Sequence, residues 1–305
     1  GHKIHMEIMG HGTPTVIMEN GAGDFSFIWN LVQPAIGKFT KAVSYDRAGY
    51  AWSEPGPMPR TGHQLCMELY TALQNAGIKG PYILVGQSFG GFLVRDFARY
   101  YPTEIVGMVL VEALNEDSRI LINNKPTRIR EFANGRPEPA PQAFFKPVTS
   151  PEKSMATIDT TIEPPLDRFA GNLKSLQIWA QSQPSYKIAR DSEMTWSPED
   201  VTKLYKHKGE PSYMLGHMPL IVLTRGKGGY DGRADSLELE TERLKQQEDL
   251  YHLSTNSKNI IDMNSGHNIH IEDPETVINA IKSVFMSAKY HKPLQQIKQV
   301  LPSRH

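Results

Sequence analysis

Short runs of apolar residues alternate with longer amphipathic segments along the first third of the chain. The short runs are mostly Val, Ile and Leu, a composition typical of strands buried on both faces of a parallel sheet. They span residues 14–20, 41–49, 81–86 and 106–113. The segments 61–77 and 88–102 have the apolar spacing of helices. This order predicts an α/β fold, with a mostly parallel sheet and helices on both faces.

The alternation stops at residue 114 and resumes after residue 217. Pro, Glu, Lys and Ser are frequent in the first half of this interval, and the second half predicts helices at 164–182 and 197–207. After it, two more strands alternate with two more helices. We therefore expect an α/β core interrupted by an inserted, mainly helical lid. The predicted parts are a core of residues 1–113 and 218–288, a lid of residues 114–217 and a C-terminal tail of residues 289–305.

Charge and composition exclude several kinds of partner. Lys+Arg 33 and Asp+Glu 33 give a formal net charge of +0, so nothing predicts binding to nucleic acid or to an anionic membrane. The sequence contains no apolar run of the length that a transmembrane helix needs. Cys66 is the only cysteine, which excludes an intramolecular disulfide. A lone thiol fits both the cytoplasm and export after removal of a signal peptide.

A serine lies between glycines where the strand 81–86 meets the helix 88–102. The sequence Gly86-Gln87-Ser88-Phe89-Gly90 has the G-x-S-x-G spacing of a sharp strand-to-helix turn, in which the serine backbone is strained. The glycines remove Cβ atoms that would collide with the neighbouring strand and helix. Such a turn leaves the Ser88 oxygen beside a helix N-terminus, whose free N–H groups favour negative charge. Ser88 is therefore the candidate nucleophile.

A serine hydroxyl needs a base to remove its proton, and the candidate base is His267. It lies after the last predicted strand and before the last helix, so we expect it at the same sheet edge as Ser88. His270, three residues later, is expected to be packed or hydrogen-bonded. The stretch "GAGDFS" fails the G-x-G-x-x-G spacing, and no cluster has metal-ligand spacing. We therefore expect neither an organic cofactor nor a metal.

Together these residues resemble the α/β-hydrolase family over essentially the whole chain apart from the predicted lid. The matching stretches are residues 86–90, Asn20-Gly21-Ala22-Gly23, Asp46-Arg47-Ala48-Gly49-Tyr50 with Ser53, and Gly266-His267. The resemblance implies an oxyanion hole made by the backbone N–H groups of Ala22 and Phe89. Many members have histidine at the position of Asn20, a departure that leaves the Ala22 backbone available. A plain glycine-rich turn is the alternative for this loop.

The acid of the implied Ser–acid–His triad has two candidate positions. In most of the family it follows the penultimate strand, but here that turn reads Gly226-Lys227-Gly228-Gly229 and Asp231 comes two residues late. The other family position is the end of the strand after the nucleophile helix, where Glu112 ends an apolar run. A carboxylate there is costly to bury without a partner such as an imidazole N–H, which favours Glu112. Its alternative role is capping a lid helix or pairing with a lid arginine such as Arg119, and Glu116 and Asp117 are further candidates for the acid.

These parts predict a serine hydrolase that cleaves a carboxylic ester through an acyl-enzyme, with a small-molecule ester or related acyl compound as substrate. Amide or peptide cleavage and C–C bond hydrolysis use the same machinery and are alternatives, as is a small-ligand receptor without turnover. Serine at position 88 argues against haloalkane dehalogenation and epoxide hydrolysis, which in this family use an aspartate. Trp52, Trp179 and Trp196 are candidates to contact the substrate. Asp46 and Arg47 are expected to pair and to hold the nearby loop in place.

Overall fold

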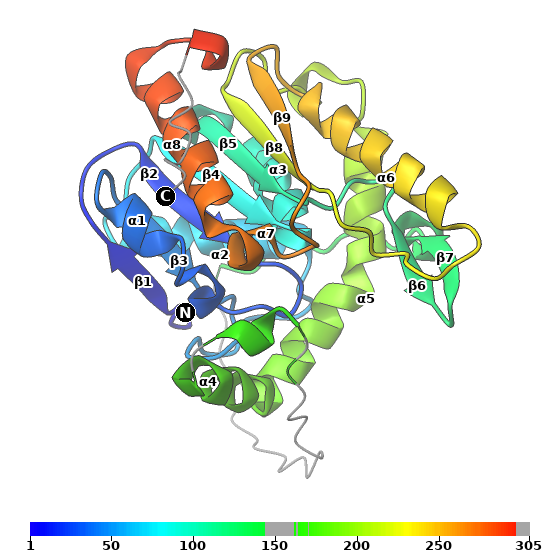
Figure 1. The fold of residues 1–305 in the computed structure, drawn as a ribbon. Coiled ribbons are helices and arrows are strands. Elements are labelled where there is room, and N and C mark those ends of the chain that lie inside the picture. Colours follow the sequence, from blue (N-terminus) through cyan, green and yellow to red (C-terminus); the bar gives the residue numbers. More distant parts are fainter. Residues whose placement is uncertain (144–161, 163, 170, 297–305) are drawn as a thin grey trace.

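The computed structural model describes residues 1–143, 162, 164–169 and 171–296 and is built around one large sheet (Figure 1). Within these ranges the sheet has seven strands in the order β1-β3-β2-β4-β5-β8-β9. Each neighbouring pair is parallel except β1, which runs antiparallel to β3. The strands are β1 (Met6–Met9), β2 (Thr15–Glu19), β3 (Ala42–Tyr45), β4 (Tyr82–Gln87), β5 (Ile105–Val111), β8 (Leu220–Arg225) and β9 (Ser257–Asp262). The predicted mostly parallel sheet is therefore confirmed.

Helices cover both faces of this sheet because its central strands are apolar on both sides. Along β4, Tyr82 and Leu84 pack into one core, and Ile83 and Val85 pack into the other. The first core contains residues of α2 (Gly62–Asn75), α3 (Phe89–Tyr100) and α6 (Ser236–Tyr251). The second contains residues of α1 (Gln33–Gly37), α7 (Ile269–Glu272) and α8 (Pro274–Tyr290). Helix α8 extends two residues into the predicted tail, and Leu294 beyond it is also buried.

The segment between β5 and β8 is here called the insertion, and its described residues form a small hairpin, two α-helices and short 3-10 turns. The hairpin of β6 (Arg119–Ile122) and β7 (Lys125–Arg128) was not predicted. Its turn residues Asn123 and Asn124 have φ values of 48° and 61°, the left-handed backbone that two-residue hairpin turns require. The Asn-Asn pair is a sequence signal that could have predicted this hairpin turn.

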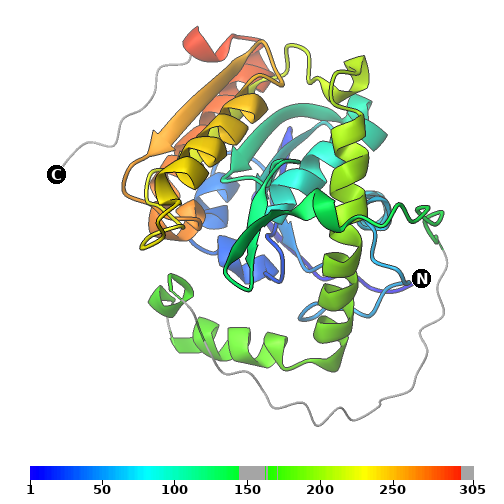
Figure 2. The same ribbon diagram turned by 90° about the vertical axis from the view of Figure 1, so that its right-hand side faces the viewer.

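Helix α5 (Pro184–Lys206) of the insertion begins well before the predicted helix at 197–207. Its buried positions include Glu193 and Asp200, so the stripe that faces the core is partly charged and escapes a search for apolar spacing. Figure 2 shows α5 alongside the core, with α4 (Gly171–Gln181) turned across the N-terminal end of α5. Part of the interval 114–217, residues 144–161, 163 and 170, lies outside the described residues, as do 297–305 of the tail. The role of the insertion as a lid stays a prediction.

None of the helices in the described part of the chain is both long and apolar enough to cross a membrane.

Candidate active site

The turn between β4 and α3 places Ser88 at the end of a central strand. Its backbone has φ 53° and ψ −119°, a strained conformation for a residue with a side chain. The N–H of Ser88 donates to the Val111 carbonyl at 3.1 Å, and its carbonyl accepts from the N–H groups of Gly91 at 3.0 Å and Leu114 at 2.9 Å. These three backbone hydrogen bonds hold the strained residue between β5 and the first turn of α3.

The glycines around Ser88 allow the chain segments to approach very closely. A Cβ atom on Gly86 would lie 2.4 Å from the carbonyl oxygen of Gly90, and one on Gly90 would lie 2.5 Å from that of Glu19. A Cβ on Gly91 would meet the Cβ of Ala113 at 2.3 Å. Real Cβ atoms do not come this near to backbone, so the turn requires glycine at these positions. This agrees with the reason that the sequence suggested.

The loop after β2 brings the Ala22 N–H to the same sheet edge. Arg47 donates to the carbonyls of Asn20 at 3.0 Å and Gly21 at 2.8 Å, which fixes the backbone of this loop. The Asn20 side chain is occupied elsewhere, since it donates to the Tyr45 carbonyl and accepts from the Trp29 indole. The Asn20 side chain is therefore not available to an oxyanion, which leaves the Ala22 backbone N–H as the candidate donor of this loop.

The second predicted donor, Phe89, is the first residue of α3. Within the described ranges, no residue accepts a hydrogen bond from the backbone N–H of Phe89 or of Ala22. The first N–H groups of a helix have no partner inside the helix, and they carry part of its positive dipole. The assignment of both N–H groups to an oxyanion hole stays a prediction.

Arg47 is itself held in a buried ion-pair cluster that joins the core to the insertion. Its guanidinium pairs with Glu19 on β2 at 2.8 Å and with Glu193 on α5 at 3.1 Å. Glu193 also accepts from the Tyr50 hydroxyl at 2.8 Å. Asp46 accepts from the Ser26 N–H at 2.8 Å. Arg47 thus pairs with Glu19 and Glu193 and Asp46 pairs with His5 at 2.9 Å, so both residues hold loops but each has its own partner.

His267 lies in the loop between β9 and α7, at the same end of the sheet as Ser88. The carbonyl of His267 accepts from Gln87 Nε2 at 3.4 Å, which ties the loop to the strand before the serine. His267 is exposed as a residue, although protein atoms surround its imidazole closely enough to desolvate it. Among the residues that the structure describes, no hydrogen bond joins it to Ser88 or to Glu112. Its place in a triad therefore stays a prediction.

The charges around His267 determine its protonation state. Its pKa is lowered, first because the surrounding protein desolvates the imidazolium. The carboxylate of Glu112 opposes this effect, and the guanidinium groups of Arg225 and Arg243 add to it. The imidazole is therefore neutral near pH 7 and can accept a proton, as a general base must.

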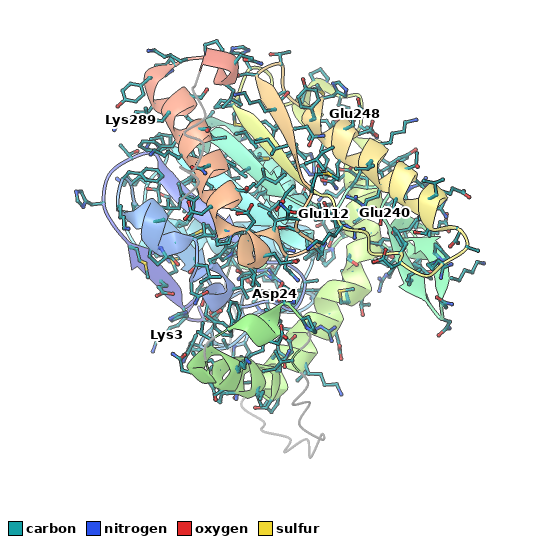
Figure 3. The ribbon with its side chains drawn as sticks, in the orientation of Figure 1. Lys3, Asp24, Glu112, Glu240, Glu248 and Lys289 are labelled. Carbon is teal, nitrogen blue, oxygen red and sulfur yellow. The ribbon has the colours of Figure 1, made fainter. Side chains whose placement is uncertain are left out.

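Glu112 follows β5 in a strained backbone conformation, with φ 42°, and its side chain is buried. Its carboxylate accepts from the Arg225 N–H at 2.8 Å, from Arg225 Nε at 3.0 Å and from Arg243 Nη1 at 2.9 Å. Glu240 pairs with the same two arginines, and Figure 3 shows Glu112 and Glu240 on the side of the core where α6 lies. The predicted alternative of pairing with a lid arginine is wrong, because the arginines that bind Glu112 belong to β8 and α6 of the core, and Arg119 pairs with Glu242.

Sequence reasoning missed Arg225, although a signal for it was present. Arg225 ends β8, the strand that pairs with β5, and Glu112 directly follows β5. A basic and an acidic residue therefore stand at the ends of two neighbouring apolar strands. Asp231, the other candidate acid, is exposed, and its Oδ1 lies 2.8 Å from the position that a Cβ on Gly228 would occupy. In the described part of the chain, no hydrogen bond or ion pair connects Asp231 with His267. Both assignments of the acid stay predictions.

The three candidate substrate-contacting tryptophans lie in two different places. Trp52 and Trp179 are both partly exposed, and their rings lie 5.2 Å apart where the loop after β3 meets α4. Trp196 on α5 instead lies under the guanidinium of Arg136, at 4.3 Å. The structure thus brings together the first two but not the third.

His270 is fully buried at the start of α7, with its ring 4.8 Å from that of Trp29. Neither of its ring nitrogens has a hydrogen-bond partner among the described residues. Burial, aided by the nearby His267, lowers the pKa of His270 to about 3. Of the two roles expected for it, packing is the one that the structure shows.

Comparison with known proteins identifies the family. A model of the Alpha/beta hydrolase family matches residues 11–280, and the chain belongs to this family. Among curated relatives, the "Probable transporter efuK" of Hormonema carpetanum is 25% identical over 97% of this chain. The "Uncharacterized protein YqjL" of Bacillus subtilis is 26% identical over 94% of this chain and 88% of its own length. The chain spans only 43% of the length of efuK.

Solved structures show the same fold. A thermophilic esterase from Thermogutta terrifontis superposes with a TM-score of 0.63 at 17% sequence identity, and the match covers 94% of each chain. At this identity the likeness establishes the fold alone.

Proposed function

We propose that this protein is a serine hydrolase that cleaves a carboxylic ester. The observation that carries the proposal is the strained backbone of Ser88, held between β4 and the N-terminus of α3. A serine kept at φ 53° needs surrounding structure to stabilise it, and such strain concentrates at functional sites. The strain exposes the hydroxyl at the start of a helix, where negative charge is stabilised.

In the proposed reaction, the Ser88 hydroxyl attacks the ester carbonyl carbon while the neutral imidazole of His267 takes its proton. The N–H groups of Ala22 and Phe89 donate to the oxyanion that forms. The imidazolium then gives the proton to the leaving alcohol as the C–O bond breaks, which leaves an acyl-serine. Water attacks this acyl group in the same way, and the carboxylic acid and free Ser88 are released.

Glu112 is the proposed acid, because its charge favours the imidazolium that His267 becomes during the reaction. The two arginines that bind Glu112 compensate for the burial of its carboxylate. They also hold the acid in one orientation. The insertion is proposed to act as a lid, with Trp52 and Trp179 lining the apolar part of the substrate site.

The first experiment compares the purified protein with its Ser88→Ala variant on p-nitrophenyl acetate, butyrate and octanoate. We expect many turnovers per enzyme molecule for the wild type and a loss of at least about 1,000-fold in kcat for the variant. Circular dichroism of both proteins shows whether the variant is folded.

Turnover that survives in folded Ser88→Ala would overturn the assignment of the nucleophile. An inactive wild type on all three esters would overturn the esterase proposal. The same two proteins would then be assayed on amides and on β-diketones, the substrate types of the amidase and C–C hydrolase alternatives.

A further inference from the structure

The end of the sheet opposite Ser88 borders a cavity that the proposed reaction does not use. Its volume is about 300 Å³, which is at the lower end of the range for small-molecule sites. Ile105 at the start of β5 and Met218 just before β8 both line it. Arg99 of α3 also lines it and follows Ser88 by eleven residues in the sequence. The helical rise of 1.5 Å per residue therefore puts the cavity about 16 Å from Ser88.

The walls of this cavity come from the core and from the insertion. The core contributes the C-terminal end of α3 and Leu253 after α6, and the insertion contributes Leu204 of α5 and residues 211–218. Figure 2 shows the C-terminal half of α5 beside the core. Hydrogen bonds fix the segment 211–218, because the Leu215 N–H donates to the Leu253 carbonyl at 2.8 Å and Ser254 Oγ donates to the Met218 carbonyl at 2.6 Å. The cavity is therefore bounded by ordered chain on each side.

Most of the surface inside the cavity is apolar. Of the twelve described residues that line it, nine are apolar and the others are Arg95, Arg99 and Tyr213. None of the twelve carries a carboxylate. A ligand that fits these walls therefore needs an apolar body, and any charged group on it would meet positive side chains only.

The two arginines differ in how their guanidinium groups are satisfied. Arg95 donates from all three of its side-chain nitrogens, to two backbone carbonyls and to Glu116. Arg99 donates only from Nη1, to Asp96 Oδ1 at 2.6 Å. Neither Nε nor Nη2 of Arg99 has a partner among the described residues, although the side chain is only 14% exposed. Arg99 therefore keeps unused N–H groups beside an apolar cavity.

Unused donors on a largely buried guanidinium are unfavourable unless an acceptor reaches them. Arg99 Nε is fully buried, whereas Nη2 keeps accessible surface. A carboxylate is the acceptor that suits a guanidinium best, because both are planar and the hydrogen bond joins opposite charges. Asp96 occupies only the Nη1 side. Since the lining supplies no second carboxylate, the acceptor for Nη2 has to come from a bound molecule.

We propose that this cavity binds a medium-chain carboxylate, with its alkyl chain against the apolar walls and its carboxylate on Arg99 Nη2. The cavity volume equals about ten groups the size of a water molecule, at ~30 Å³ each, which is room for a chain of about eight carbons. Met214 and Met218 line the cavity, and their flexible thioethers adapt to the shape of a ligand. The inference is independent of the proposed ester hydrolysis, because the two sites share no residue.

The experiment is an NMR titration of protein labelled with ¹³C at its methionine methyl groups, at pH 7.5. Octanoate should shift the methyl signals of Met214 and Met218 until they saturate, and it should leave that of Met194 unchanged. Met194 is the internal control because it is exposed on α5 but does not line the cavity. Acetate, which lacks the chain, and octylammonium, which has the opposite charge, should shift neither signal. 1-Octanol should bind about 10-fold more weakly than octanoate, because its hydrogen bond to Arg99 lacks the second charge.

Arg99→Gln tests the guanidinium, and its amide can still donate to Asp96. The Kd of octanoate should rise about 10-fold while that of 1-octanol stays the same, so the two values should become nearly equal. A general disturbance of the cavity would instead weaken both ligands.

A second set of variants leaves the ion pair between Arg99 and Asp96 intact. Met214 is 45% exposed, so Met214→Glu adds a carboxylate at the rim and should weaken octanoate several-fold, whereas Met214→Lys should not. Met194→Glu is the matched control and should bind octanoate as the wild type does.

The proposal would be overturned if octanoate in the millimolar range produced no saturable shift of Met214 and Met218. Shifts confined to other methionines would place the ligand elsewhere and overturn it as well. Equal Kd values of octanoate and 1-octanol in the wild type would remove the role of Arg99. So would octanoate affinity that stays unchanged in both Arg99→Gln and Met214→Glu.

Discussion

Acidification should destabilise the protein through His270, a buried imidazole that stays neutral in the folded chain. Its pKa is about 3 in the folded state, against an ordinary value of 6.5 when the chain unfolds. Below pH 6.5 the unfolded state therefore binds a proton that the folded state cannot accept. The contribution of the buried, neutral His270 to the free energy of unfolding is therefore fully present above pH 6.5, and it is lost as the pH falls towards 3. The slope is about 1.4 kcal/mol per pH unit, so the loss between pH 7.5 and pH 5 is about 2 kcal/mol.

Urea unfolding of the wild type and of His270→Leu at pH 7.5 and pH 5 would measure this loss. Other groups that titrate in this range, such as Asp24, are present in both proteins and largely cancel when the two pH differences are subtracted. The variant should therefore lose about 2 kcal/mol less on acidification, whatever its stability at pH 7.5. As a control, His252→Leu removes an exposed histidine and should behave as the wild type does.

The reasoning would be refuted if His270→Leu and the wild type lost the same free energy of unfolding between the two pH values. Equal losses would mean that the His270 imidazole binds a proton in the folded state. Its burial against Trp29 would then not isolate it from water.

Two further predictions concern the site itself. Glu112→Gln should lower kcat for p-nitrophenyl butyrate by about 100-fold or more while Asp231→Asn stays near the wild type; the reverse result would assign the acid to Asp231. Gly90→Ala should destabilise the protein by about 1–3 kcal/mol and reduce activity, because its Cβ would lie 2.5 Å from the Glu19 carbonyl oxygen. Gly171→Ala should leave stability and activity unchanged, because its Cβ would meet nothing within 4 Å. Equal melting temperatures for the Gly90→Ala and Gly171→Ala variants would contradict this account.

The sheet and its flanking helices could be predicted because their stability depends on which positions are apolar. The serine turn could also be predicted, because a sharp strand-to-helix turn brings backbone segments close together and requires glycine at these points, here at residues 86, 90 and 91. Both features depend on residues that lie close together in the sequence.

The partners of buried charges could not be predicted, because they join residues far apart in the sequence. Arg47 and Glu193 are 146 positions apart, and Arg225 and Glu112 are 113 apart. No periodicity relates such positions, and a charge in a helix usually indicates an exposed face. For the same reason the first half of α5 was missed: it is buried through Glu193 as much as through apolar residues.

The pairing of Arg47 with Glu193 decides how the site can be opened. Pulling α5 from the core would leave a buried guanidinium without one of its carboxylates, and breaking such a pair costs about 3–5 kcal/mol. The contact of Trp179 on α4 with Trp52 of the core is made by two partly exposed rings. Helix α5 is therefore the anchored part of the insertion, and under the proposal that the insertion is a lid, opening on the α4 side would cost less than lifting the whole insertion.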